Sequence, residues 1–204
     1  MRVKPIGLVL AGGLSRRMGG GDKALKRLAG TAILACIVGR IGPQVSELWL
    51  NANGPAERFG LHLPLVPDSV PDAPGPLAGI LAGLDHAAVH NPDVRHVLTV
   101  PADCPFLPDD LVARLAAATG RAGSACASSG GRIHGVIGVW PVASRHELRR
   151  LLVDEGIRRV DGWLERAGTA TVEWPAEPYD PFFNVNTPGD LAEAEQILRH
   201  YPTA

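Results

Sequence analysis

Short apolar runs alternate with longer stretches of helical periodicity along the first part of the chain. A continuous apolar run, typical of a strand buried on both faces of a parallel sheet, lies at 6–10, and further strands are expected at 45–50, 63–66 and 95–100. Apolar residues at helical spacing lie at 31–41, 77–89 and 108–119. This alternation over residues 1–120 predicts an α/β fold of three layers, with a doubly wound and mostly parallel sheet.

The second part of the chain has a different pattern. Strand-like runs at 124–128 and 133–140 flank a Ser-Gly-Gly turn, which is typical of a hairpin. Helices are expected at 144–153 and 158–167, and a strand at 169–174. Thr187 as N-cap, Pro188 at the first helical position and Asp190 in the first turn predict a last helix ending near Tyr201. No repeat or long linker divides the chain, so we expect one domain spanning residues 1–204.

Composition and charge exclude several classes of function. The 204 residues are 46% hydrophobic, enough for a core without disulfides or metal staples. A net charge of −1 argues against wholesale binding to nucleic acid or to an anionic membrane. The three cysteines, Cys36, Cys104 and Cys126, form no CxxC pair and fit a reducing cytosol. With no transmembrane-length apolar run and no signal-peptide pattern, we expect a cytoplasmic protein.

A glycine-rich stretch follows the first predicted strand. It runs from Leu10-Ala11-Gly12-Gly13 through Arg16 and Arg17 to Lys23. Glycines let backbone N–H groups approach a phosphate closely, and the cations add charge where a triphosphate would lie. The stretch is not a P-loop, because Asp22 precedes Lys23 and Ala24 follows it where Ser or Thr would bind magnesium. The alternative is a surface loop with solvated arginines.

Polar residues also follow the other predicted strands. Asp103 ends the strand at 95–100, and a carboxylate there suits magnesium, which prefers oxygen ligands and phosphates. Asn51, Asn53 and Asp68 follow two neighbouring strands, at the edge where such sheets bind ligands. The segment at 74–79 opens a helix toward that edge. The alternative for each is an ordinary turn or capping residue.

Two asparagines precede the last predicted helix. Alternation places Asn184 and Asn186 on one face, with Val185 on the other. Two amides on one face could hold a metal, a phosphate or a sugar hydroxyl, and the alternative is an Asx-rich turn. Cys104 beside Asp103 has no histidine fixed next to it, so a packed thiol is favoured over a nucleophile.

These motifs, in this order, resemble the molybdenum cofactor guanylyltransferases within the wider nucleotidyltransferase superfamily. The matching elements are LAGG, RRMGG, DK, NAN, PD, GPLAG, a D-x-P segment and NVNTP, at 10–13, 16–20, 22–23, 51–53, 67–68, 75–79, 103–105 and 184–188. They span almost the whole chain in register. Gly135 follows His134 where the family would have a proline, and this departure falls on the pterin side of the site.

The resemblance implies a nucleotide-diphospho-sugar transferase-like variant of the Rossmann fold, with a GTP-binding half at 1–120 and a second-substrate half at 121–204. It implies GTP contacts from Leu10, Ala11, Gly12, Gly13, Lys23, Asn51, Asp68 and Asp103. It implies Mg²⁺ binding by Asp103, and catalytic roles for Lys23, Asp103 and Arg17. Asn184 and Asn186 would line the site for the second substrate.

The implied reaction transfers GMP from GTP to the phosphate of the molybdopterin cofactor and releases pyrophosphate. The attacking phosphate is already an anion, so no general base is required, and the charges on the triphosphate must be offset instead. The alternative hypotheses for the function are a CTP-using molybdopterin cytidylyltransferase, a sugar-phosphate nucleotidyltransferase of the same fold, and a non-catalytic GTP-binding adapter. GTP and molybdopterin are the expected small-molecule partners, and proteins that deliver or accept the cofactor are compatible with this function.

Overall fold

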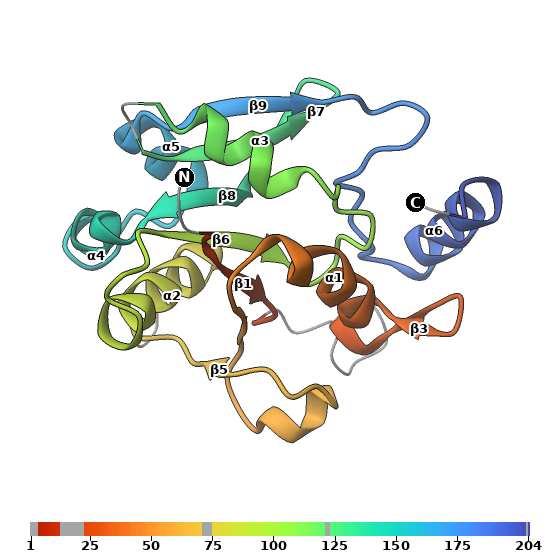
Figure 1. Cartoon of the computed structure of the whole chain (residues 1–204), viewed down its shortest axis with the longest axis horizontal. Coiled ribbons are helices and arrows are strands. Elements are labelled where there is room, and N and C mark those ends of the chain that lie inside the picture. Colours follow the sequence, from red (N-terminus) through yellow and green to blue (C-terminus); the bar gives the residue numbers. More distant parts are fainter. Residues whose placement is uncertain (1–3, 13–22, 71–74, 121–122, 203) are drawn as a thin grey trace.

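A seven-stranded sheet forms the centre of the molecule (Figure 1). The computed structural model describes residues 4–12, 23–70, 75–120, 123–202 and 204. In sheet order the strands are β5 (Leu65–Val66), β4 (Leu48–Asn51), β1 (Ile6–Leu10), β6 (His96–Pro101), β8 (Arg132–Pro141), β7 (Ala125–Ser129) and β9 (Ala170–Trp174). Only β8 is antiparallel to its neighbours, which confirms the mostly parallel sheet.

Helices cover both faces of this sheet, as the alternating pattern predicted. One face packs against α1 (Ile33–Ile41), α3 (Leu111–Ala118) and α6 (Pro188–His200), and the other against α2 (Pro76–His90), α4 (Arg145–Val153) and α5 (Val160–Ala167). The side chain of Val9 in β1 packs into the hydrophobic core on the α1, α3 and α6 face of the sheet. The side chains of Ile6 and Leu8 pack into the core on the opposite face, and all three are fully buried. The continuous apolar sequence of β1 therefore reflects burial on both faces.

Local signals placed most element boundaries correctly. Thr187 caps α6 as expected: its side chain accepts from the N–H of Asp190, whose carboxylate accepts from the N–H of Thr187. Four short 3-10 helices complete the described structure, at Lys23–Leu25, Gly42–Gln44, Ala56–Phe59 and Val142–Ser144.

One small hairpin was missed. Residues 31–32, expected to begin a helix, instead form β3 (Thr31–Ala32), paired with β2 (Arg27–Leu28). Ala29 and Gly30, with φ of 48° and 87°, make the two-residue turn between them. Strands of two residues are too short for any alternation to be recognised, so periodicity could not find them.

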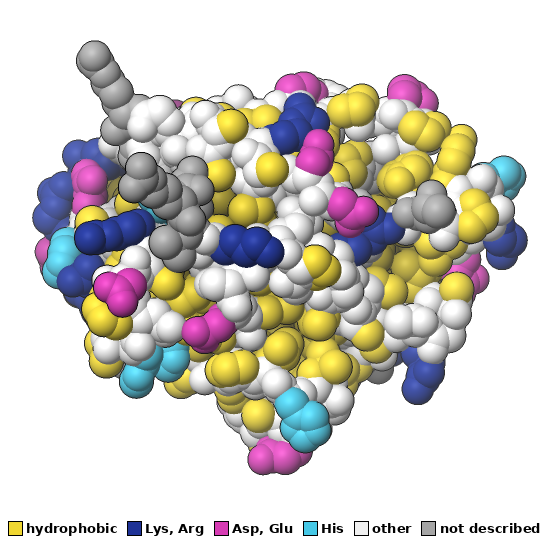
Figure 2. All heavy atoms as spheres, in the orientation of Figure 1, with side chains coloured by type: hydrophobic (Ala, Val, Ile, Leu, Met, Phe, Trp, Pro, Cys, Tyr) yellow, Lys and Arg dark blue, Asp and Glu magenta, His cyan; other side chains and the backbone are white. Residues whose placement is uncertain are grey.

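Charged side chains are mixed rather than segregated by sign. On the face seen in Figure 2, Lys and Arg side chains lie interspersed with Asp and Glu. Several pair locally, as Arg150 and Arg166 do with Glu155 at 2.8 Å. Among the described residues, no helix is both long and apolar enough to cross a bilayer.

Candidate functional site

The carboxyl ends of three central strands meet at one edge of the sheet. Leu10 at the end of β1 pairs in register with Asn51 of β4 and with Pro101 of β6. Two further backbone bonds continue the ladder beyond the strands, from the N–H of Ala11 to Asn51 O at 2.8 Å and from the N–H of Ala102 to Leu10 O at 3.0 Å. The predicted residues Leu10, Ala11 and Asn51 therefore lie together at the edge where parallel sheets bind ligands.

Asn51, Asn53 and Asp68 form one hydrogen-bonded group at this edge, here called the amide–carboxylate cluster. The Nδ2 atom of Asn51 donates to Asp68 Oδ1 and to the carbonyl of Val66, both at 3.0 Å. Asn53 Nδ2 donates to Asp68 Oδ2 at 3.0 Å, and Asn53 Oδ1 accepts from the N–H of Asp68 at 3.1 Å. Both amide hydrogens of the buried Asn51 are thus used to hold Asp68 and β5 in place.

The cluster leaves Asp68 able to read a polar ligand. An ionised carboxylate offers about four acceptor sites, and the two amide donors occupy one on each oxygen. The remaining sites can accept hydrogen bonds from N–H groups of a base or hydroxyls of a ribose. Asp68 is half-buried, so such bonds would form at the edge of the protein rather than in its core.

The first turn of α2 lies directly against this cluster. A Cβ atom at Gly79 would overlap Oδ1 of Asn51 and stand 2.9 Å from Cδ2 of Leu10. Only glycine permits this approach, which sets the N-terminus of α2 at the strand-end edge. Backbone N–H groups in the first turn of a helix favour anions, so phosphate oxygens would be stabilised there.

The structure brings Asp103 and Asn184 together from positions 81 residues apart. Asn184 Nδ2 donates to Asp103 Oδ1 at 2.9 Å and lies 3.2 Å from Cys104 Sγ. The N–H of Val185 donates to the carbonyl of Asp103 at 2.9 Å, which fastens the two segments. Cys104 is fully buried with its thiol directed at the carbonyl of Phe182, which agrees with a packed thiol.

Asn186 has a described contact at the start of α6. Its N–H donates to Asp190 Oδ2 at 2.7 Å, beside the cap of α6, and its side chain is exposed. Val185 is fully buried between the two asparagines, in agreement with the expected alternation. The described contact of Asp103 with this pair of asparagines comes from Asn184.

The donor set around Asp103 suits one kind of metal ion. Over the described part of the chain, no three His, Cys, Asp or Glu side chains gather closely enough to hold a metal. Mg²⁺ is commonly bound by one or two carboxylates together with substrate phosphates. Among the described residues, the Asp103 carboxylate without a close group of other metal-ligating side chains therefore fits a metal that arrives with a triphosphate rather than an all-protein metal centre.

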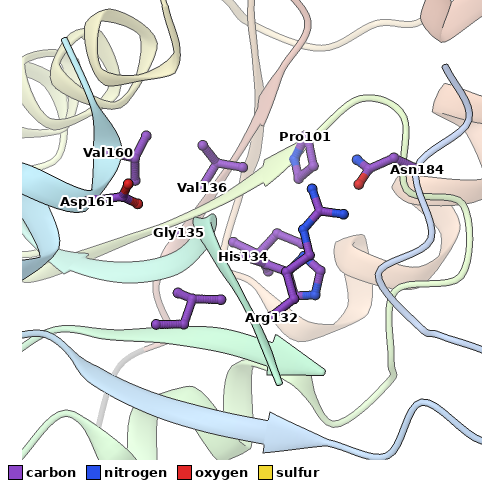
Figure 3. A pocket seen from close by; sticks show the side chains of 10 residues that line it. Pro101, Arg132, His134, Gly135, Val136, Val160, Asp161 and Asn184 are labelled. Carbon is purple, nitrogen blue, oxygen red and sulfur yellow. The ribbon is translucent and has the colours of Figure 1, made fainter. Parts of the chain in front are cut away.

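A pocket of about 250 Å³ has Asn184 among its lining residues. It is lined by Pro101 of β6, residues 132–137 of β8, Val160 and Asp161 of α5, and Asn184. Figure 3 shows the guanidinium group of Arg132 directed toward Asn184 across this pocket. A guanidinium, an imidazole and a carboxamide around one cavity suit a polar ring that carries an anionic group.

An irregularity in β8 shapes this cavity, which is called the bulge pocket below. Ala127 of β7 pairs with His134, but the preceding Cys126 pairs with Gly138, so residues 135–137 bulge out of the ladder. The hydroxyl of Thr99 donates to the carbonyl of Val136 at 2.7 Å and fixes the bulge to β6. Bulges are frequent beside active sites, where they redirect side chains.

Arg132 and His134 are pocket residues that were not among the predicted site residues. Burial lowers the pKa of the His134 imidazole, Asp180 opposes this effect, and Arg132 adds to it. At neutral pH the imidazole is therefore uncharged and can both donate and accept hydrogen bonds. For Arg132 the sequence offered only a polar position on a predicted hairpin strand, which does not distinguish a site from an exposed face, whereas the resemblance had placed the His134-Gly135 pair on the pterin side.

Several predicted residues cannot be placed. Gly13, Arg16, Arg17 and Asp22 lie outside the described residues, and so does the side chain of Lys23. Gly12 is exposed immediately beyond β1. The contribution of the glycine-rich stretch beyond Gly12 therefore stays a prediction.

Comparison with known proteins gives one consistent family. A family model for the MobA-like NTP transferase domain matches residues 7–167. A molybdenum cofactor guanylyltransferase of Rhodopseudomonas palustris (strain BisB5) is 54% identical over 193 residues, covering 93% of this chain and 92% of the relative.

Two solved structures share the fold. Molybdopterin-guanine dinucleotide biosynthesis protein A from Archaeoglobus fulgidus has a TM-score of 0.73 and 24% identity, covering 96% of this chain and 99% of that chain. The 2-C-methyl-D-erythritol 4-phosphate cytidylyltransferase from Thermus thermophilus has a TM-score of 0.68 and 19% identity, covering 97% of this chain and 99% of that chain. This likeness confirms the fold expected for nucleotide-diphospho-sugar transferases.

Proposed function

Since the chain belongs to the MobA-like NTP transferase family, we propose that it transfers GMP from GTP to the phosphate of the molybdopterin cofactor and releases pyrophosphate. The 54% identity to a molybdenum cofactor guanylyltransferase over 93% of the chain supports this substrate pair. The observation that carries the proposal is the contact between Asp103 and Asn184. This contact joins the strand-end edge, suited to a nucleotide, to the bulge pocket, suited to a second polar substrate.

The bond changes of this reaction are simple. An oxygen of the molybdopterin phosphate forms a bond to the α-phosphorus of GTP, while the bond from that phosphorus to the oxygen bridging to the β-phosphate breaks. Pyrophosphate leaves with the electron pair. Because the attacking oxygen is already anionic, positioning and charge stabilisation supply most of the rate, and no proton needs to be removed.

The described residues divide the binding work between two regions. The amide–carboxylate cluster and the first turn of α2 would receive the base, ribose and phosphates of GTP. Arg132 is placed to receive the anionic group of the second substrate, since a guanidinium pairs well with phosphate. Lys23 and Arg17 are proposed from the resemblance to offset charge on the triphosphate.

The proposed metal is Mg²⁺, held by the Asp103 carboxylate together with phosphate oxygens of GTP. When bound there, it would neutralise part of the charge on the triphosphate and on the departing pyrophosphate. Asn184 donates to one carboxylate oxygen of Asp103 and so orients the group. Family membership supports the use of a divalent metal, and the choice of magnesium belongs to the proposal.

The separation of the GTP-binding residues from the second-substrate residues supports the proposed single domain over residues 1–204, with a GTP-binding half and a second-substrate half. Asn51, Asp68 and Asp103 come from residues 1–120, whereas Arg132 and Asn184 come from residues 121–204. We place the reaction in the cytoplasm, because free cysteines fit a reducing compartment.

The decisive experiment is mass spectrometry of the products after incubation with GTP, Mg²⁺ and molybdopterin. The proposal expects molybdopterin guanine dinucleotide and an equimolar amount of pyrophosphate. A dinucleotide formed faster from CTP in a comparison of four nucleoside triphosphates would assign the chain to cytidylyl transfer. Binding of GTP without any turnover would instead support an adapter.

A further inference from the structure

A chain of hydrogen bonds runs behind the bulge pocket and links three separate segments. Asp180 Oδ1 accepts from the hydroxyl of Ser129 at 2.8 Å and from the backbone N–H of Phe182 at 2.9 Å. The same hydroxyl oxygen of Ser129 lies 2.7 Å from Nε2 of His134. The chain therefore joins β7, β8 and the segment at 180–186 that carries Asn184.

The direction of these bonds sets the tautomer of His134. Ser129 has one hydroxyl hydrogen, and this hydrogen goes to Asp180. The oxygen of Ser129 must then accept, so Nε2 of His134 carries a hydrogen and donates. In the neutral ring Nδ1 is left as a hydrogen-bond acceptor, and His134 is one of the residues that line the bulge pocket.

The segment that carries Asn184 is held on both sides of that residue. The Phe182 ring packs against the rings of His134 and Trp174, with distances between ring centroids of 4.8 Å and 5.4 Å. Beyond Asn184, the N–H of Val185 is fixed to the carbonyl of Asp103. Asp180 therefore anchors one end of a short segment whose Phe182 and Val185 side chains are buried, and movement of Phe182 would displace His134 and Asn184 together.

We propose that Ser129 and Asp180 are positioning residues for the second substrate, holding the His134 imidazole and the Asn184 carboxamide at the bulge pocket. This inference rests on the proposed function and concerns chiefly its molybdopterin side, since Asn184 also orients Asp103. GTP would bind at the amide–carboxylate cluster, and among the described residues no hydrogen bond links this cluster to Ser129, His134 or Asp180. Loss of the hydrogen bonds among Ser129, His134 and Asp180 should therefore raise KM for molybdopterin more than KM for GTP.

Ser129→Ala tests the link to His134, and Ser128→Ala is its matched control. Both serines are buried neighbours on β7, but the hydroxyl of Ser128 contacts Val172 and Glu173 of β9. In Ser129→Ala we expect KM for molybdopterin to rise about tenfold with KM for GTP unchanged, because a positioning hydrogen bond is lost. Ser128→Ala should leave both KM values near wild type.

Asp180 is tested by a conservative and a truncating substitution. Asp180→Asn keeps an acceptor oxygen for Ser129 and Phe182, so it should retain KM for molybdopterin within about twofold. Asp180→Ala removes both bonds and should raise that KM about tenfold or more and lower kcat, since displaced groups lose their alignment. If Asp180 had a purely structural role, Asp180→Ala would lower the melting temperature without raising KM for molybdopterin more than KM for GTP.

Nitrogen NMR of labelled histidine gives a readout independent of activity. Wild type should show His134 with its hydrogen on Nε2 alone, and Ser129→Ala should shift toward the mixture of tautomers of a free imidazole, with His134→Gln used for assignment. If wild type makes no dinucleotide, the proposed function fails, while the tautomer still tests the hydrogen-bond chain. If wild type is active and Ser129→Ala matches Ser128→Ala in KM for molybdopterin, the positioning role is wrong.

Discussion

Replacing Gly79 by alanine should damage both stability and nucleotide binding through one added methyl group. The new Cβ would overlap Asn51 Oδ1 and approach Cδ2 of Leu10 to 2.9 Å. Asn51 is 4% exposed and donates to both Val66 and Asp68, so it cannot move without weakening those bonds. The amide–carboxylate cluster would therefore be disturbed although none of its own residues is changed.

The size of the effect follows from opposing contributions. Overpacking in a dense core costs about 1–3 kcal/mol, and each weakened hydrogen bond costs about 0.5–1.5 kcal/mol. Alanine regains about 0.8–1 kcal/mol in helix propensity. With both bonds of Asn51 weakened, we expect a net loss of about 1–5 kcal/mol, which lowers the melting temperature by roughly 2–4 °C per kcal/mol for a protein of this size.

Gly39→Ala is the matched control for this prediction. Gly39 lies within α1, and a Cβ there would meet nothing within 4 Å. This variant should gain up to about 1 kcal/mol from helix propensity and bind GTP as wild type does. The assay is thermal unfolding of both variants with and without GTP and Mg²⁺. Equal stability and equal GTP-induced shifts in the two variants would refute the close approach of α2 to Asn51.

Three further predictions concern the reaction itself. Asp103→Asn should keep the bond from Asn184 but lower the turnover of GTP by about 10²-fold, because an amide holds Mg²⁺ poorly; a near wild-type rate would exclude Asp103 as the metal ligand. Lys23→Ala should lower kcat together with kcat/KM in steady-state assays, because charge grows on the leaving pyrophosphate, whereas a change in KM alone would make Lys23 a docking residue. GTP with Mg²⁺ at about 100 times its Kd should stabilise the fold by about 2.7 kcal/mol, a rise in melting temperature of roughly 5–10 °C; a larger rise with CTP would contradict guanine specificity.

Much of the candidate site could be anticipated because strand ends are visible in sequence. Asn51, Asp68 and Asp103 each follow an apolar run, and parallel strands bring their carboxyl ends to one edge. The structure places the first two in one hydrogen-bonded cluster and Asp103 at the end of the next strand but one. Their roles toward GTP and metal stay predictions.

The hydrogen-bonded partners of these residues were harder to predict from the sequence. Asn184 could be assigned to a face by alternation, but its contact with Asp103 depends on how residues 180–186 cross the sheet. His134, Ser129 and Asp180 form their chain only after β7, β8 and the segment before α6 are assembled. No spacing rule links positions 129, 134 and 180.

The sequence by itself determined the layers of this protein, because burial on two faces requires apolar strands and amphipathic helices, and both patterns are local. It also determined the cap of α6, because the capping residues lie within four positions of one another. It determined the family, because the order and spacing of the motifs can be read directly along the sequence. Only the tertiary structure decided the bulge of residues 135–137, the pocket beside Asn184 and the approach of α2 at Gly79. These features depend on register and on close packing between distant elements, which local propensity and periodicity do not encode.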